Sequence, residues 1–340
     1  MADQLYPTAF NSTVSDTDRL ERLNNPAVRG GILMNLDANL FVTNSIMRES
    51  IPKGNMFKEF WRYSDIGSEI HDVGDEILAM GTKRRKRKIF LDDRPRVSKD
   101  TFDDIEEFLS DWSAQQKTAE RMGVELAQHA EIRAMKLPLL ASREAKLTDD
   151  FIGGGIDGNG KAVDIGTGNA ATRAGILLNK LDTIDRYWFD ISMNDANRTV
   201  WIESDIWYAL RDRDDVFPGD KVPFFHGDVT QSASPSPADL AGPQAELRYK
   251  GFRIVRSQLE KRVLGKNLSD DRYEPGDFTD TLGVAYTPEC AALIISKGVS
   301  VEAYRTPENL ANHIQSSLML GGGTIYPEKA IEIIGTVAGD

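Results

Sequence analysis

The chain has 340 residues, enough for two domains or for one domain that carries long extensions. Its formal net charge at pH 7 is −12, and because contact with phosphate favours an excess of Lys and Arg, this balance excludes a protein whose main surface binds nucleic acid. Residues 1–17 lack the layout of a signal peptide and no apolar run is long enough to span a membrane, so we expect a soluble product made in the cytoplasm.

The first part of the chain predicts an arm and a hairpin. Residues 1–52 are weakly patterned and are interrupted by several Asn, Pro and Gly residues, which predicts an extended arm that is ordered only by what it contacts. Residues 57–92 predict a long hairpin, in which turn formers such as Gly74 and Asp75 separate a strand that begins at Phe57 from a strand over residues 83–91. Because an isolated two-stranded hairpin is marginal in water, we expect it to lie on another surface, such as that of a second subunit.

Six consecutive basic residues open the second strand of this hairpin. Because side chains alternate along a strand, both of its faces are predicted to be basic. The two sets are Lys83, Arg85 and Arg87 on one face, and Arg84, Lys86 and Lys88 on the other.

Three interpretations of the basic run are open. A nuclear localisation signal fits poorly, because the run is embedded beside the strand residues Ile89, Phe90 and Leu91. A nucleic-acid patch would have aromatic residues interleaved with the basic ones, and the run has none. The third interpretation is contact with the acidic surface of another copy of the chain, where each exposed pair adds at most about 1 kcal/mol, so that only many copies make the sum matter. The acidic candidates for this intersubunit contact are Asp103, Asp104, Glu106 and Glu107.

Residues 100–137 predict a long amphipathic helix that spans a domain. Apolar residues recur at spacings of three, four and seven, which keeps one stripe of the helix buried. At 1.5 Å per residue the helix would be roughly 55 Å long. Ser98, Asp100 or Thr101 is expected to cap its start, carboxylates crowd its first turns, and Pro138 is expected to end it.

The remaining elements are shorter. The sequence predicts a flexible Gly-rich connector over residues 149–167, an amphipathic helix over 169–187, a strand over 199–202, and a helix from its cap at Ser204 to Arg211. Further on it predicts an exposed loop over 219–242, strands over 251–259, 281–286 and 291–296, and two strands within 314–334 that are separated by the glycines 321–323 and by Pro327. Helices and strands do not alternate, so the fold class is α+β with mostly antiparallel sheets.

The Gly-rich segment 155–161 meets the spacing of a phosphate-binding loop up to Lys161. However, Ala162 stands where Ser or Thr would hold magnesium, and no predicted strand leads into the segment. Asp157 and Asn159 are possible calcium ligands, but no Glu occupies the position of the bidentate ligand in a twelve-residue loop. These departures favour a connector over a nucleotide or calcium site.

Other chemistry is not indicated. The four histidines are scattered singly without a second His, Cys or paired carboxylate at ligand spacing, which argues against zinc. The one cysteine, Cys290, lies in an apolar run and is expected to be a small buried hydrophobe without a disulfide partner. The sequence therefore predicts a protein that is not an enzyme and that holds no cofactor or metal.

Several segments, in this order, resemble the major capsid proteins of tailed phages, which share the Hong Kong ninety-seven fold. The closest resemblance is to those of T-seven-like podoviruses, over about residues 41–334. The segments that carry it are Gly74-Asp75-Glu76-Ile77, residues 102–112, residues 197–210, Gly251-Phe252-Arg253-Ile254-Val255, and residues 318–334 with Tyr326-Pro327-Glu328-Lys329-Ala330.

This resemblance implies an N-terminal arm (1–52), an extended loop (53–92), a peripheral domain with a spine helix (93–165), an axial domain (166–280), and returning peripheral strands that end in an axial strand (281–340). It implies a structural protein that self-assembles into the pentamers and hexamers of an icosahedral head enclosing double-stranded DNA without sequence-specific contact. A scaffolding protein and a portal would be partners during assembly in the host cytoplasm, and the product would reside in the virion with no membrane. Two alternatives stay open: an encapsulin-like compartment shell, and a nucleotide-dependent enzyme that uses residues 155–161.

Overall fold

The computed structural model describes residues 45–52, 54–63, 83–103, 112–148, 151–191, 193, 197–213, 246–256, 276–306 and 311–335. Most of the predicted arm, the predicted hairpin tip and the predicted loop 219–242 lie outside these residues. The chain divides into two compact units: Met1–Leu40, Asp93–His129 and Lys297–Met319 form the smaller, and Phe41–Asp92, Ala130–Ser296 and Leu320–Asp340 form the larger. Helices and mostly antiparallel sheets make up the described residues, which confirms the α+β class.

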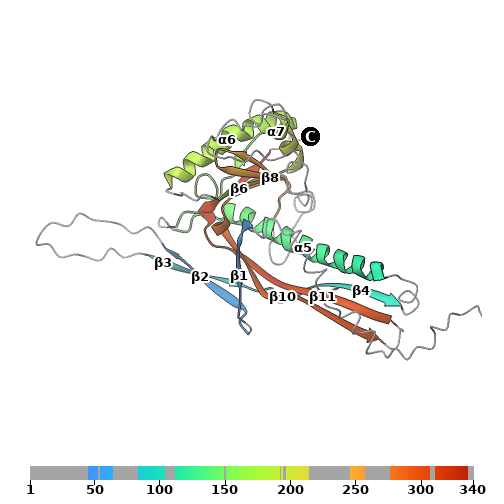
Figure 1. The fold of residues 1–340 in the computed structure, drawn as a ribbon. Coiled ribbons are helices and arrows are strands. Elements are labelled where there is room, and N and C mark those ends of the chain that lie inside the picture. Colours follow the sequence, from blue (N-terminus) through green and yellow to red (C-terminus); the bar gives the residue numbers. More distant parts are fainter. Residues whose placement is uncertain are drawn as a thin grey trace, which may run out of the picture. The chain divides into compact units, whose positions relative to one another are not determined.

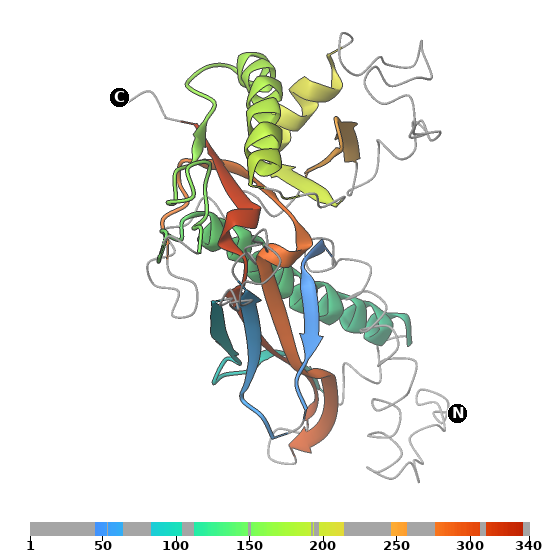
Figure 2. The same ribbon diagram turned by 90° about the vertical axis from the view of Figure 1, so that its left-hand side faces the viewer.

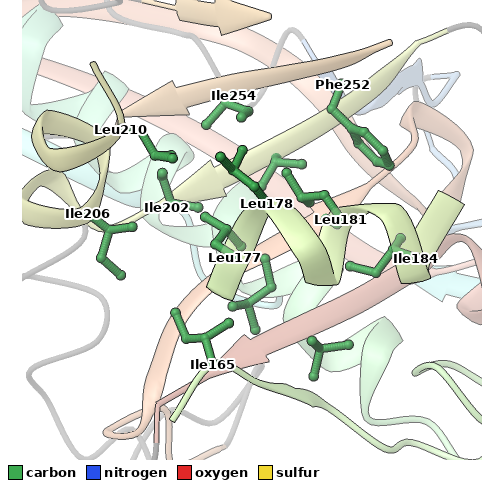
Figure 3. Packing of buried hydrophobic residues seen from close by; sticks show 14 of the residues in the cluster. Ile165, Leu177, Leu178, Leu181, Ile184, Ile202, Ile206, Leu210, Phe252 and Ile254 are labelled. Atoms are coloured by element: carbon green, nitrogen blue, oxygen red, sulfur yellow. The ribbon is translucent and has the colours of Figure 1, made fainter. Parts of the chain in front are cut away.

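The larger unit contains a six-stranded sheet covered on one face by two helices (Figures 1 and 2). The helices are α6 (Ala170–Asp190) and α7 (Ser204–Arg211). Their apolar stripes pack on the sheet in the main hydrophobic core, and Figure 3 shows Leu177 and Leu181 of α6 pointing into it. In sheet order the strands are β5 (Val163–Asp164), β12 (Ala330–Ile334), β9 (Thr281–Tyr286), β6 (Arg198–Ile202), β8 (Phe252–Arg256) and β7 (Glu246–Tyr249).

Helix α6 begins with a side-chain cap at Asn169, whereas the predicted cap of α7 is wrong by one residue. Asn169 Oδ1 accepts a hydrogen bond from the Thr172 amide at 2.9 Å. At α7 the N-cap is Glu203, and Ser204 is the first helical residue. The Glu203 amide donates to the Leu282 carbonyl of β9 at 2.8 Å, so strand pairing continues to Glu203 and the helix begins directly after it.

A second sheet contains β1 (Met47–Ser50), β10 (Ala291–Thr306), β11 (Ala311–Thr324) and β4 (Arg96–Asp103), in that order. The predicted break at the glycines 321–323 is wrong, since β11 continues through them and the chain turns only at the 3₁₀ helix η4 (Pro327–Lys329). A Cβ at Gly321 would lie 2.4 Å from the Phe90 carbonyl oxygen, and one at Gly322 would lie 2.8 Å from the Leu137 side chain. These glycines therefore permit close packing of a strand.

The predicted long helix also differs from the observed one. Helix α5 spans Trp112–Ser142, whereas residues 100–103 are the end of β4, paired with residues 311–314 of β11. Pro138 lies inside the helix. A proline costs about 3 kcal/mol there, but its neighbours Leu137 and Leu139 are fully buried, so packing keeps the last turn helical. No described helix is both long enough and apolar enough to cross a membrane.

Candidate functional site: the basic hairpin

The basic run lies on one strand of a two-stranded ribbon. Strand β2 (Phe57–Tyr63) pairs antiparallel with β3 (Arg84–Phe90), from Phe57 opposite Phe90 to Tyr63 opposite Arg84 (Figures 1 and 2). This confirms the predicted pair of strands. Because side chains alternate, the ribbon has two faces. We call them the inner face (Lys58, Phe60, Arg62, Arg85, Arg87 and Ile89) and the outward face (Phe57, Glu59, Trp61, Tyr63, Arg84, Lys86, Lys88 and Phe90).

Arg62 joins the inner face to two other segments of the larger unit. Its Nη2 donates to Glu328 Oε2 and to the Ile152 carbonyl oxygen, both at 2.7 Å, and its guanidinium lies 5.2 Å from the Phe151 ring centroid. Both charged side chains are largely buried. Burial raises the pKa of the Glu328 carboxyl, and the charge of Arg62 acts in the opposite direction. The Arg62 side chain is therefore bound within its own chain.

Arg87 makes the second such link. Its Nη1 donates to Glu144 Oε1 at 2.7 Å, and Glu144 Oε2 accepts from Thr324 Oγ1 at 2.8 Å. Burial opposes ionisation of Glu144, but the hydrogen bond and the charge of Arg87, the hydrogen bond from Thr324 and the charge of Arg85 together outweigh it, so the pKa of this carboxyl is lowered. We call Arg62–Glu328 and Arg87–Glu144 the two anchor pairs.

Apolar contacts hold the base of the same face. Ile89 is buried and Phe60 is partly buried, and both pack into a small hydrophobic cluster. Lys58 adds an exposed ion pair with Glu49 at 2.6 Å. The other buried members of the cluster are Ile51, Leu91, Ala292, Ile294 and Ile325. Arg87 is therefore paired within its own chain, and its contact with another copy stays a prediction.

The outward face combines exposed aromatic rings with cations. The exposed fractions of Phe57, Trp61, Tyr63 and Phe90 are 39%, 48%, 55% and 59%, which leaves large apolar area in contact with solvent. Each of the three outward cations lies over an aromatic ring. The distances to the ring centroids are 4.8 Å for Lys88 Nζ over Phe57, 5.2 Å for Lys86 Nζ over Trp61 and 5.8 Å for Arg84 Cζ over Tyr63.

A single carboxylate, Glu59, interrupts the outward face. It forms ion pairs with Lys86 and, at 3.7 Å, with Lys88. The hydrogen bond from Lys86 lowers the pKa of Glu59, so this carboxylate stays charged between the two lysines. Three cations face one anion, and this surface is therefore positive in a chain whose net charge is −12.

The aromatic residues of this surface were not predicted from the sequence. The basic run itself has no interleaved aromatic residue, but β2 supplies Phe57, Trp61 and Tyr63 to the same face. The signal was present in the alternation of β2, because every second residue from Phe57 falls on one face of the ribbon. Only the register between the strands shows that this is the face of Arg84 and Lys86.

The Gly-rich loop is compact, which corrects the prediction of a flexible connector. The carbonyl oxygens of Glu144 and Ala330 accept from the amides of Gly154 and Gly155, at 2.8 and 3.1 Å. Asp157 Oδ1 accepts from two further loop amides, at 2.9 and 3.0 Å. A phosphate-binding loop directs such amides at its ligand, whereas these are used within the protein, which argues against a nucleotide site.

The other candidates give no further centre. Cys290 is buried, and burial raises the pKa of its thiol. Among the residues that the structure describes, no group of three or more His, Cys, Asp or Glu side chains could hold a metal ion. Asp103 is the last residue of β4. Asp104, Glu106 and Glu107 lie outside the described residues.

Comparison with known proteins supports the fold. No family model and no curated protein matches the chain. Among solved structures, the capsid of cyanophage P-SCSP1u has a TM-score of 0.64 at 17% identity, covering 86% of this chain and 87% of that one. The mature capsid of bacteriophage PhiM1 gives 0.66 at 13%, covering 88% of each chain, and the capsid of cyanophage Pam1 gives 0.53 at 11%, covering 90% and 93%. The fold of the chain is therefore that of phage capsid proteins, the predicted Hong Kong ninety-seven fold.

Proposed function

We propose that the chain is the major capsid protein of a tailed phage, a structural subunit that self-assembles into pentamers and hexamers of an icosahedral head around double-stranded DNA. The observation that carries this proposal is the fold match to phage capsids over nearly the full length of both partners. A match of this extent leaves little of the chain for an additional catalytic domain. The same match supports a place in the virion and self-association as the main interaction.

The outward face of the β2–β3 ribbon is the surface that we propose for contact between subunits. Its exposed rings and its excess of positive charge suit an acidic segment that also carries apolar side chains. Residues 100–112 of another copy have this composition, with six carboxylates and no basic residue. A contact between two different surfaces of identical chains is heterologous, and it closes into rings when the rotation between copies permits.

The finer assignments belong to the same proposal. The T-seven-like subgroup, the scaffolding protein and portal as assembly partners, and assembly in the host cytoplasm follow from the resemblance in sequence. So do the five domains, in which residues 166–280 with α6 and α7 form the axial domain and residues 53–92 with β2 and β3 form the extended loop.

Electron microscopy of the purified chain, expressed with and without a candidate scaffolding protein, tests the proposal. We expect ring-shaped capsomers or closed shells in negative stain. Nucleic acid in shells recovered from infected cells, measured as the ratio of absorbance at 260 and 280 nm, separates a phage head from a compartment shell that holds cargo enzymes. Stable monomers at high protein concentration, with and without the scaffolding protein, would overturn it.

A further inference from the structure

We infer that Arg62 and Arg87 are positioning residues: the two anchor pairs fix the β2–β3 ribbon beyond its base to its own chain and thereby set the orientation of the outward face. The effect on assembly rests on the proposed function. The anchoring itself is a property of the single chain and can be measured before any assembly.

The ribbon needs such anchors because of what its inner face contains. Two paired strands without further contacts are marginal in water. On the inner face, apolar side chains occur at Phe60 and Ile89, near the base of the ribbon. Arg87 lies opposite Phe60, and the described positions of this face that lie further toward the tip are Arg62 and Arg85. The ribbon beyond its base is therefore held by charged groups and their partners.

The two anchor pairs lie on different elements, and this is what gives them a positioning role. Glu144 follows the end of α5 and is itself fixed by Thr324 of β11, whereas Glu328 lies in η4. Arg62 also donates to the Ile152 carbonyl. A single attachment would let the ribbon rotate about it, but attachments from both strands to separate elements restrict bending and twisting together. Both cations are guanidinium groups, whose planar donors have a fixed geometry.

The two anchor pairs differ in their response to pH. The folded pKa of Glu144 is lowered, so this anchor is strongest above the ordinary pKa of a glutamate and weakens as the pH falls through the folded value. The folded pKa of Glu328 is raised, so its contribution has the opposite sign and is lost as the pH rises through the folded value. The groups that face the carboxylates are Arg85, Arg87 and Thr324 for Glu144, and Arg62, Lys329, Tyr187 and Tyr326 for Glu328.

Hydrogen exchange of the unassembled chain, followed by mass spectrometry, tests the anchoring. We expect Arg62→Ala and Arg87→Ala each to lower the protection of β2 and β3 amides by about tenfold or more, because the ribbon opens locally without its anchor. Protection in α6 should stay the same, and Arg62→Lys should restore part of the loss in β2. Arg84→Ala is the matched control, since it removes a cation from the outward face of the same strand. Unchanged protection in both anchor variants would overturn the inference.

The pH profile and the assembly assay separate positioning from simple packing. Acid should loosen the ribbon of the wild-type chain through Glu144, and Glu144→Gln should remove that part of the pH dependence. Indistinguishable acid profiles of the two chains would contradict the assigned role of Glu144.

If Arg62→Ala loosens the ribbon but forms shells at the wild-type rate, the positioning role is wrong while the proposed function stands. If the wild-type chain forms no shells, the proposed function fails, and the exchange data still decide the anchoring.

Discussion

The two faces of the β2–β3 ribbon have similar composition and different partners. Both combine arginine or lysine with aromatic or aliphatic residues, yet Arg62 and Arg87 of the inner face pair with partly buried carboxylates, whereas the outward face leaves its rings and cations at the surface. The difference arises from the alternation of side chains along two strands, because neighbouring residues of one basic run point in opposite directions. The basic run therefore contributes to two surfaces with separate roles. Substitutions of adjacent residues should differ in their effects on stability and on assembly.

The largest difference is expected between Arg62 and Arg84. Replacing Arg62 by Ala leaves the largely buried Glu328 carboxylate without its cation, and breaking such a pair costs about 3 kcal/mol or more of unfolding free energy. Replacing Arg84 by Ala removes only an exposed contact with the Tyr63 ring, which is worth at most about 1 kcal/mol. Urea denaturation of both variants measures the two losses. Equal losses would show that the faces are not distinguished by burial.

The next difference is between two neighbours in β3. Ile89 is 3% exposed and packs in the small hydrophobic cluster, so Ile89→Ala should cost about 2–3 kcal/mol. Phe90 is 59% exposed, and Phe90→Ala should change the stability by less than about 1 kcal/mol. Thermal unfolding of the two variants under identical conditions provides the measurement. A larger loss of stability for Phe90→Ala than for Ile89→Ala would indicate that the outward face of the ribbon, and not the inner face, packs on the protein.

Patterns that depend on near neighbours were the ones the sequence predicted correctly. The apolar stripe of α6, the strand pair β2–β3 and the bounds of β9 all follow from local periodicity. Within the candidate site, the alternation of the basic residues is confirmed by the burial pattern of β3. Local rules therefore give the elements and the direction of their side chains.

What the sequence could not show depends on contacts between distant segments. The residues around Asp100 were expected to begin a helix, but pairing with β11 makes them a strand. Glycine is typical of turns, yet Gly321 lies within strand β11, where the absence of a Cβ leaves room for the Phe90 carbonyl. The aromatic half of the outward face required the register between β2 and β3, and the partner of Arg87 lies 57 residues further along the chain.

Reversal of charge on the outward face should affect assembly more than stability. The double variant Lys86→Glu and Lys88→Glu removes the partners of Glu59 and makes the face negative, with a small loss of stability because these groups are exposed. We expect shell formation to be lost, and the variant with arginine at both positions to retain it. Counting shells by electron microscopy at one protein and salt concentration tests this. Wild-type shell yields from the reversed variant would contradict the proposed subunit contact.

The pairing of Arg87 within its own chain changes the expected effect of a charge reversal at Arg85 and Arg87. The double variant Arg85→Glu and Arg87→Glu reverses two charges of the inner face. In the structure Arg87 pairs with Glu144 inside the same subunit, so the change would place like charges together and lower the melting temperature of the monomer. The reversal of Lys86 and Lys88 is therefore the cleaner test of contact between subunits.

The smallest expected effect is the pH dependence of the anchor pairs, and it is informative because the two carboxylates differ in sign. The ordinary pKa of a glutamate is about 4. As the pH falls below this value, the wild-type chain loses the contribution of Glu144 to the unfolding free energy, because the folded pKa of Glu144 is lowered. Glu144→Gln should therefore flatten the fall in stability between pH 6 and pH 3. Glu328 has a raised folded pKa and partly compensates this fall, so Glu328→Gln should make it steeper. Unfolding free energies at several pH values test both slopes, and a flattening of the same size in both variants would contradict the assignment of opposite roles to the two anchors.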